Sequence, residues 1–141
     1  MKFTNENGQE NSLKRSATLP GYEVTLAEDT VIDSAVNNPF FKGINILQLP
    51  KKLKGFRDNP DLKTLLEPQA LHTGIKLELA EDEFALFEPN LDLVTNKRLQ
   101  NVNRAFENGQ EVVPQFVNFG LKKVSLKLGM VVGTIIIIPT K

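Results

Sequence analysis

The sequence has no cysteine and a single histidine, His72, among its 141 residues. Without cysteine the chain can form no disulfide, no thiolate nucleophile and no cysteine-ligated zinc or iron–sulfur site. One histidine cannot build a metal site that needs several histidine ligands. We therefore expect no metal and no cofactor, and we interpret His72 as a structural residue.

The chain also lacks net charge. Its 17 Lys and Arg residues balance its 17 Asp and Glu residues, so the formal charge is zero. A balanced chain has no overall field that draws in nucleic acid or an anionic membrane, and we predict neither as a partner. The segment PKKLKGFR does gather Lys51, Lys52, Lys54 and Arg57, but a small basic group without a wider basic face is typical of a solvated loop.

Long hydrophobic runs are missing as well. The longest, from Gly129 to Pro139, is about half of the roughly 20 residues that a membrane-spanning helix needs. Residues 1–18 are polar and lack the apolar core of a signal peptide. We expect a location in the virion if the gene belongs to a phage, and in the cytoplasm otherwise.

Composition divides the chain into three parts. Residues 1–18 contain too few large apolar side chains to offset the entropy of ordering, which predicts a flexible N-terminal tail. Residues 19–141 are predicted to form one β domain. Within it, residues 37–66 are rich in proline and glycine and are expected to form an inserted loop, with at most one short helix in DNPDLKTLL.

Period-two alternation predicts short strands in the rest of the chain. Tyr22, Val24 and Leu26 alternate with polar or small neighbours, and the same pattern recurs in two later segments. These are Ile75, Leu77 and Leu79, and then Val124, Leu126 and Leu128. EVVPQFVNF is a further strand, in which Pro114 indicates an edge or a bulge. Many short strands with turn signals between them predict a mainly β fold, a small barrel or sandwich of short strands.

The last apolar segment, VVGTIIIIP, contains four consecutive isoleucines. Because successive side chains of a strand point to opposite faces, the four cannot all enter one core. A second subunit could cover the other face. Ile135, Ile136, Ile137 and Ile138 are therefore the candidates for a subunit interface.

Three segments in order resemble the trimeric deoxyuridine triphosphatases (dUTPases), which have a β-clip architecture. GYEVTLAED is similar to the family's first motif. TGIKLELAEDEFALFEPNLDL is similar to the hairpin that ends at the family's P-R-S-G-L, and NFGLKKVSLKLGMVVGTIIIIP to its N-x-G turn and last strands. The matching positions are Thr73, Gly74, Pro89, Leu93, Asn118, Gly120, Gly129 and Pro139. The resemblance implies a dUTPase-like β-clip fold and a homotrimer.

The same resemblance implies that catalysis has been lost. Where the family has arginine and serine for phosphate contact, then glycine, this chain has Asn90, Leu91 and Asp92. The segment after Leu93 lacks the third motif's catalytic aspartate and stacking tyrosine, and Met130 and Thr134 replace the aspartate and glutamine of the fourth motif. No glycine-rich tail follows the last strand. Without a base, a phosphate arginine and a closing tail, phosphate hydrolysis has no transition-state stabilisation, so we expect no catalytic residues.

Other polar residues are interpreted as structural. Glu81, Asp82 and Glu83 are expected to form a solvated turn, and Glu88 and Asp92 a polar rim beside the degenerate phosphate motif. Tyr22 is expected to be a core residue.

The interpretation that follows is a non-catalytic homotrimer with a structural or binding role. The lambda-type phage head decoration proteins share the β-clip architecture and have no active site, so a bacteriophage capsid is the expected larger assembly, with the tail at residues 1–18 as a tether. Two alternatives stay open: a regulatory or nucleotide-binding relative of the dUTPases, and an active enzyme of the dUTPase or dCTP deaminase type with rebuilt catalytic residues.

Overall fold

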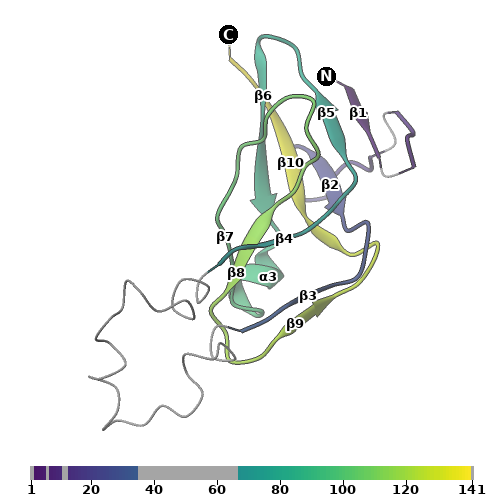
Figure 1. Ribbon diagram of the computed structural model, residues 1–141. Helices are drawn as coiled ribbons and strands as arrows, with labels where there is room; N and C mark the ends of the chain where they lie inside the picture. Colours follow the sequence, from purple (N-terminus) through teal and green to yellow (C-terminus); the bar gives the residue numbers. More distant parts are fainter. Residues whose placement is uncertain (1, 6, 11–12, 35–66, 141) are drawn as a thin grey trace, which may run out of the picture.

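The computed structural model describes residues 2–5, 7–10, 13–34 and 67–140 (Figure 1). The expected insertion at residues 37–66, with its short helix and its basic segment, lies outside these residues. The described elements, in chain order, are β1 (Lys2–Thr4), β2 (Tyr22–Thr25), β3 (Thr30–Ile32), β4 (Gln69–Ala70), β5 (Lys76–Glu78), β6 (Glu83–Pro89), α3 (Leu91–Thr95), β7 (Leu99–Asn101), β8 (Gln115–Asn118), β9 (Val124–Leu126) and β10 (Val131–Pro139). The predicted mainly β fold class is confirmed.

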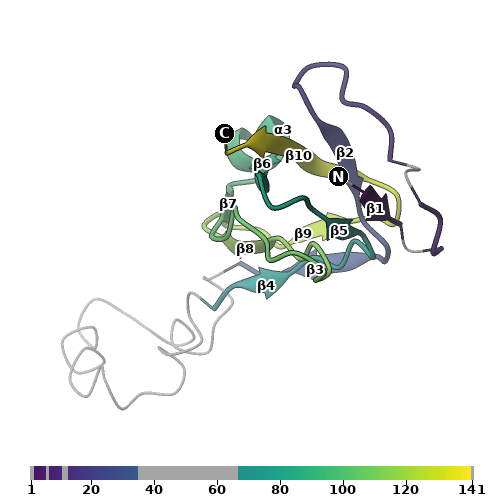
Figure 2. The ribbon, with the colours of Figure 1, turned by 90° about the horizontal axis from the view of Figure 1, so that it is seen from above.

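The strands form four small antiparallel sheets. The largest has the order β2-β10-β6, with the C-terminal strand β10 in its centre. Opposite it lie the β4-β8-β7 sheet and the β3-β9 pair, so that the core is enclosed between two layers (Figure 2). The fourth sheet is the pair β1-β5.

The core contains the residues that the alternating patterns predicted. Val24, Leu26, Ile75 and Leu77 are buried. Lys76 and Glu78, on either side of Leu77, are exposed. Phe87 of β6 lies in the middle of the core, with its ring edge-on to Phe106 and Phe116 at centroid distances of 6.2 and 6.3 Å. Leu128 differs from its prediction: β9 ends at Leu126, and Leu128 lies 62% exposed in the following turn.

Two glycines allow the central sheet to pack closely. A Cβ on Gly133 would lie 2.4 Å from the Phe87 ring, and one on Gly21 would lie 2.1 Å from the backbone oxygen of Ile135. Real Cβ atoms do not approach other heavy atoms so closely, so neither position has room for a side chain. The Phe87 ring therefore occupies the space that a side chain at position 133 would need.

The N-terminal segment differs from the flexible tail that its composition indicated. Lys2–Thr4 form β1, which pairs with β5 in the register Phe3↔Leu77. The Phe3 side chain is only 4% exposed, and its ring lies 5.0 Å from that of Tyr22. A single large aromatic side chain buries enough surface to hold a short strand against the body, which average polarity does not reveal.

The helix α3 also differs from expectation, since it lies outside the insertion. Asn90 caps it by accepting a hydrogen bond from the backbone N–H of Asp92, and Asp92 places a negative charge in its first turn. Both are ordinary signals of a helix start. The helices of the described segments are all too short or too polar to cross a membrane.

Candidate functional site

The positions of the degenerate phosphate motif border a groove of about 830 Å³ on the β2-β10-β6 sheet, which we call the motif groove. One wall is the N-terminal segment Ser16–Leu19. The opposite wall is the junction where β6 passes into α3, including Glu88, Asn90 and Leu91. Thr134, on the central strand between these walls, is 6% exposed.

The polar groups at this junction bond to the protein itself. The Asn90 backbone N–H donates to the Val132 carbonyl at 2.8 Å, and its side-chain amide donates to the Val131 carbonyl at 3.3 Å. The Asp92 carboxylate accepts a hydrogen bond of 2.6 Å from the side-chain amide of Asn96. Leu91 is left 71% exposed between them. Asn90 and Asp92 therefore serve to cap and brace α3.

The charge of the motif groove is acidic. Glu23 and Glu88 line it, and its lining, within the described segments, includes no lysine or arginine. Glu88 forms an ion pair with Arg104, which lies in the wall of a neighbouring cleft and not in that of the motif groove. Binding of a triphosphate needs cations or a metal to take up its negative charge. The described residues hold no group of three or more potential metal ligands.

The two substituted positions of the fourth motif separate in the structure. Thr134 lies in the motif groove, opposite Glu23 of β2 and Glu88 of β6 in the strand register. Met130 instead packs, partly buried, against the hydrophobic core. Only one of these two positions therefore contributes to the groove.

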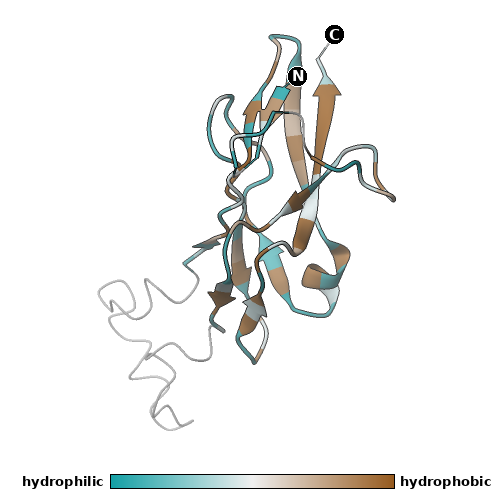
Figure 3. Cartoon of the chain, turned by 90° about the vertical axis from the view of Figure 1, so that its right-hand side faces the viewer, coloured by the Kyte–Doolittle hydropathy of each residue, from teal (hydrophilic) through white to brown (hydrophobic). Residues whose placement is uncertain are grey.

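The four isoleucines divide between the two faces of β10. Ile135 is fully buried in the core of its own chain, and Ile137 packs against that core. Ile136 and Ile138 face the other way, paired in register with Leu86 and Phe84 of β6. We call Phe84, Leu86, Ile136 and Ile138 the outer face. The final part of β10 is coloured as hydrophobic in Figure 3. The interface candidates thus narrow to Ile136 and Ile138, since the Ile135 side chain is not available to another subunit.

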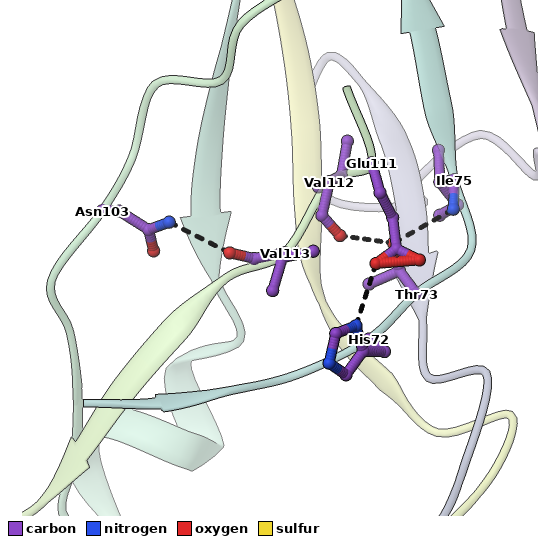
Figure 4. A network of polar contacts seen from close by, with 7 residues as sticks. All are labelled: His72, Thr73, Ile75, Asn103, Glu111, Val112 and Val113. Carbon is purple, nitrogen blue, oxygen red and sulfur yellow. Dashed lines mark hydrogen bonds and ion pairs between the residues drawn. The ribbon is translucent and has the colours of Figure 1, made fainter. Parts of the chain in front are cut away.

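His72 joins two segments that are distant in the sequence (Figure 4). Its Nδ1 lies 3.0 Å from a carboxylate oxygen of Glu111. Beside it, the buried Thr73 hydroxyl donates to the Val112 carbonyl at 2.5 Å and accepts from the Ile75 N–H at 3.2 Å. His72 and Thr73 therefore connect the chain before β5 to the chain before β8.

The His72–Glu111 pair predicts a small pH dependence of stability. The hydrogen bond to Glu111 raises the pKa of His72 above 6.5, against a smaller opposing effect of burial. Because the folded pKa is the higher one, the pair stabilises the fold fully below pH about 6.5 and loses its effect as pH rises through the folded value. The His72 side chain is 52% exposed, so we expect about 0.5 kcal/mol.

Urea unfolding at pH about 5.5 and about 8.5 measures this dependence. Glu111→Gln should reduce the difference in unfolding free energy between the two pH values. Glu107→Gln, a matched change at an exposed position nearby, should leave it unchanged. Equal pH dependence in wild type and Glu111→Gln would contradict the assignment.

Two further clefts meet at Phe119, and the sequence patterns did not indicate them. The first, of about 490 Å³, is lined by Arg98, Gln100, Asn101, Arg104 and Phe119, with Glu88 at its edge. The second, of about 790 Å³, is lined by Lys97, Arg98, Phe119, Lys122 and Lys123. We call them the arginine cleft and the lysine cleft. The only available signal was the dipeptides Lys97-Arg98 and Lys122-Lys123, which are 25 positions apart in the sequence.

Comparison with known proteins identifies the fold. No protein-family model matches the sequence, and no curated protein sequence matches it significantly. Solved structures of dUTPases do match the whole described body. The EIAV dUTPase superposes with a TM-score of 0.63 at 10% identity, over 99% of this chain and 88% of that one. A Staphylococcus bacteriophage 80alpha dUTPase gives 0.62 at 11% identity, over 92% and 76%. The Streptococcus mutans dUTPase gives 0.60 at 16% identity, over 91% and 84%. This chain therefore has a dUTPase-like fold; at such identities the likeness concerns the fold and not the activity.

Proposed function

We propose that this protein is a non-catalytic homotrimer with a dUTPase-like fold that serves as a structural or binding component of a larger assembly, a bacteriophage capsid. The observation that supports the loss of catalysis is the acidic motif groove. At the positions where the resemblance implies phosphate contacts, the described lining offers Glu23 and Glu88 and no cation. A triphosphate would meet there the Glu23 carboxylate and a Glu88 carboxylate already paired with Arg104, with no cation in the described lining to take up its charge.

The chemistry of Asn90, Leu91 and Asp92 supports the same proposal. Their polar groups are used by the helix cap and by bonds to β10 and Asn96, and Leu91 presents an apolar side chain to solvent. A phosphate site requires several free donors directed at one point. The described residues at this junction do not offer such a set.

The outer face supports the homotrimer. Phe84 is 38% exposed, and Leu86, Ile136 and Ile138 are partly exposed, so four large apolar side chains form one continuous strip across β6 and β10. Strips of this kind on an isolated chain mark surfaces that become buried on association. In a threefold ring each outer face contacts a different surface of the next subunit.

We expect purified protein to release no pyrophosphate from dUTP in the presence of Mg²⁺, because no described group in the motif groove neutralises the developing charge. The measurement is a coupled pyrophosphate assay at micromolar enzyme, with an active dUTPase as the positive reference. Turnover above background that disappears in Glu88→Gln or Asp92→Asn would show that a rebuilt active site exists and would overturn the non-catalytic proposal.

The capsid role rests on the shared architecture of small trimeric decoration proteins and on the loss of catalytic groups. Two of the structural neighbours are dUTPases of Staphylococcus phages, which agrees with a phage setting. The direct check is mass spectrometry of purified particles from the phage that encodes the chain. The protein should be present in them in a fixed ratio to the major capsid protein, and its absence would contradict a virion role.

A further inference from the structure

The surface around Phe119 concentrates positive charge on a chain whose net charge is zero. Lys97, Arg98, Lys122 and Lys123 line the lysine cleft, and its described lining contains no acidic residue. Arg104 adds a fifth cation in the arginine cleft, where its partner Glu88 is the one carboxylate among the described lining residues. Cations therefore surround Phe119, and the one carboxylate among them, Glu88, lines both the arginine cleft and the motif groove and is paired with Arg104.

Phe119 stands at the junction of the two clefts and is presented by a rigid turn. Its side chain is 56% exposed and lines both clefts. Asn118, only 2% exposed, holds the turn: its amide donates to the carbonyls of Ile32 and Lys122 at 3.0 and 2.9 Å, and its oxygen accepts from the Gly120 N–H at 2.8 Å. An exposed aromatic ring on a pre-organised turn loses little conformational entropy when a planar group stacks on it.

Arg98 is held in an unusual backbone conformation at the same point. Its φ is +58°, and it is the one non-glycine residue with positive φ in the described segments. The Phe119 N–H donates to its carbonyl at 3.0 Å, and a Cβ on Gly120 would lie 3.3 Å from the Cβ of Arg98. Glycine would adopt this conformation with less strain. An arginine in this place indicates that its side chain, which borders both clefts, has a use.

We propose that the two clefts bind single-stranded nucleic acid, with a base stacked on Phe119 and the phosphates held by Lys97, Arg98, Lys122 and Lys123. The zero net charge predicts no such partner, but net charge does not reveal that the cations gather on one surface. Sequence-independent single-strand binding combines a basic track with exposed aromatic rings, and both occur here together. The amides of Gln100 and Asn101 lie in the arginine cleft beside this ring.

The layout favours a strand over a free nucleotide. The cations occupy two adjoining clefts with the ring between them, so that one nucleotide cannot contact them all. A duplex is a poorer fit, because its bases are stacked on each other and cannot stack on Phe119. The proposal is independent of the capsid role and concerns two clefts that adjoin the motif groove at Glu88 and Pro89.

The test is fluorescence anisotropy of a labelled single-stranded DNA of about 12 nucleotides, titrated with the full chain at about 50 mM salt. We expect a Kd on the order of 10 µM, and a weakening of about twentyfold when salt rises to about 150 mM, since four phosphate contacts give a slope near 3 in log Kd against log salt. Phe119→Ala should weaken binding about tenfold by removing the stacking surface.

Two double variants distinguish binding at this site from attraction by the overall charge of the protein. The double change Lys122→Glu and Lys123→Glu should abolish measurable binding, while Lys76→Glu with Lys127→Glu, which alters the net charge equally at exposed positions elsewhere, should bind like wild type. Arg98→Gly should weaken binding about fivefold, because one cation is lost. It should unfold at the same or a higher temperature than wild type, because glycine relieves the backbone strain at this position. A loss of binding in this variant therefore cannot be attributed to poor folding.

Three results would overturn the proposal. The first is no rise in anisotropy up to about 100 µM protein at low salt. The second is an equal loss of binding in the two double variants. The third is that an unlabelled mononucleotide displaces the labelled strand at the same concentration as an unlabelled strand does. The last result would identify the ligand as a free nucleotide. A fourth result, preference for a duplex of the same sequence, would overturn it as well, because stacking on Phe119 would then not be part of recognition.

Discussion

Replacing Ile136 with Asp is expected to convert the proposed trimer into monomers. Ile136 lies on the outer face and pairs with Leu86 of β6. Its side chain is not needed for the core of its own chain, which contains Ile135 instead. In an assembled trimer each of the three carboxylates would be buried without a partner, at a cost of several kcal/mol apiece. Assembly should therefore be lost while the monomer still folds.

Light scattering after gel filtration at about 10 µM distinguishes the two states by mass. Val31→Asp is the matched control, because Val31 is also an apolar strand residue but lies 51% exposed on β3, away from the outer face. That variant should stay trimeric. A wild-type protein that elutes as a compact monomer would refute the homotrimer, and a trimeric Ile136→Asp would place the interface elsewhere.

Replacing Phe3 with Ala is expected to lower the free energy of unfolding by about 3 kcal/mol, the lower end of the range for buried phenylalanines. The ring is 4% exposed, belongs to the core cluster and contacts Tyr22. Tyr22 in turn lies beneath the guanidinium of Arg15, 5.3 Å from the ring centre. Loss of the Phe3 ring should therefore loosen both β1 and the later N-terminal segment.

Urea unfolding followed by circular dichroism gives the change, with Lys2→Ala as the control on the same strand. Lys2 is exposed and should be neutral to within about 0.5 kcal/mol. An unchanged stability for Phe3→Ala would restore the flexible tail that composition predicts. It would also return residues 1–18 to the role of a free tether in the capsid proposal.

The residues that carry the family resemblance turn out to have local structural tasks, which is why the sequence could reveal the fold. The Thr73 hydroxyl accepts a hydrogen bond from the N–H of Ile75, two residues on, and Gly74 adopts a φ of +69° that suits glycine. Asn118 holds its turn with hydrogen bonds to Gly120 and Lys122. Turn and cap chemistry of this kind depends on neighbours in the chain, so it is visible as a short motif.

The alternating strands were predictable for a related reason. A strand that is buried on one face must alternate, and this holds whatever strand it pairs with. The division of the four isoleucines between two faces follows from the same period. Which face enters the core does not, because that depends on where Phe87 and Gly133 lie.

Features made by distant segments were decided by the tertiary structure alone. The pairing of β1 with β5 joins residues more than 70 positions apart, and average polarity hid the single side chain that stabilises it. Nothing in the sequence links the dipeptides Lys97-Arg98 and Lys122-Lys123. The β7-β8 pairing and the Asn118 turn bring them to one cleft. The sequence by itself determined the mainly β class and most of the core positions, because alternation depends only on the period of a strand. The surfaces where this protein meets other molecules depend on long-range packing, and therefore only the folded chain defines them.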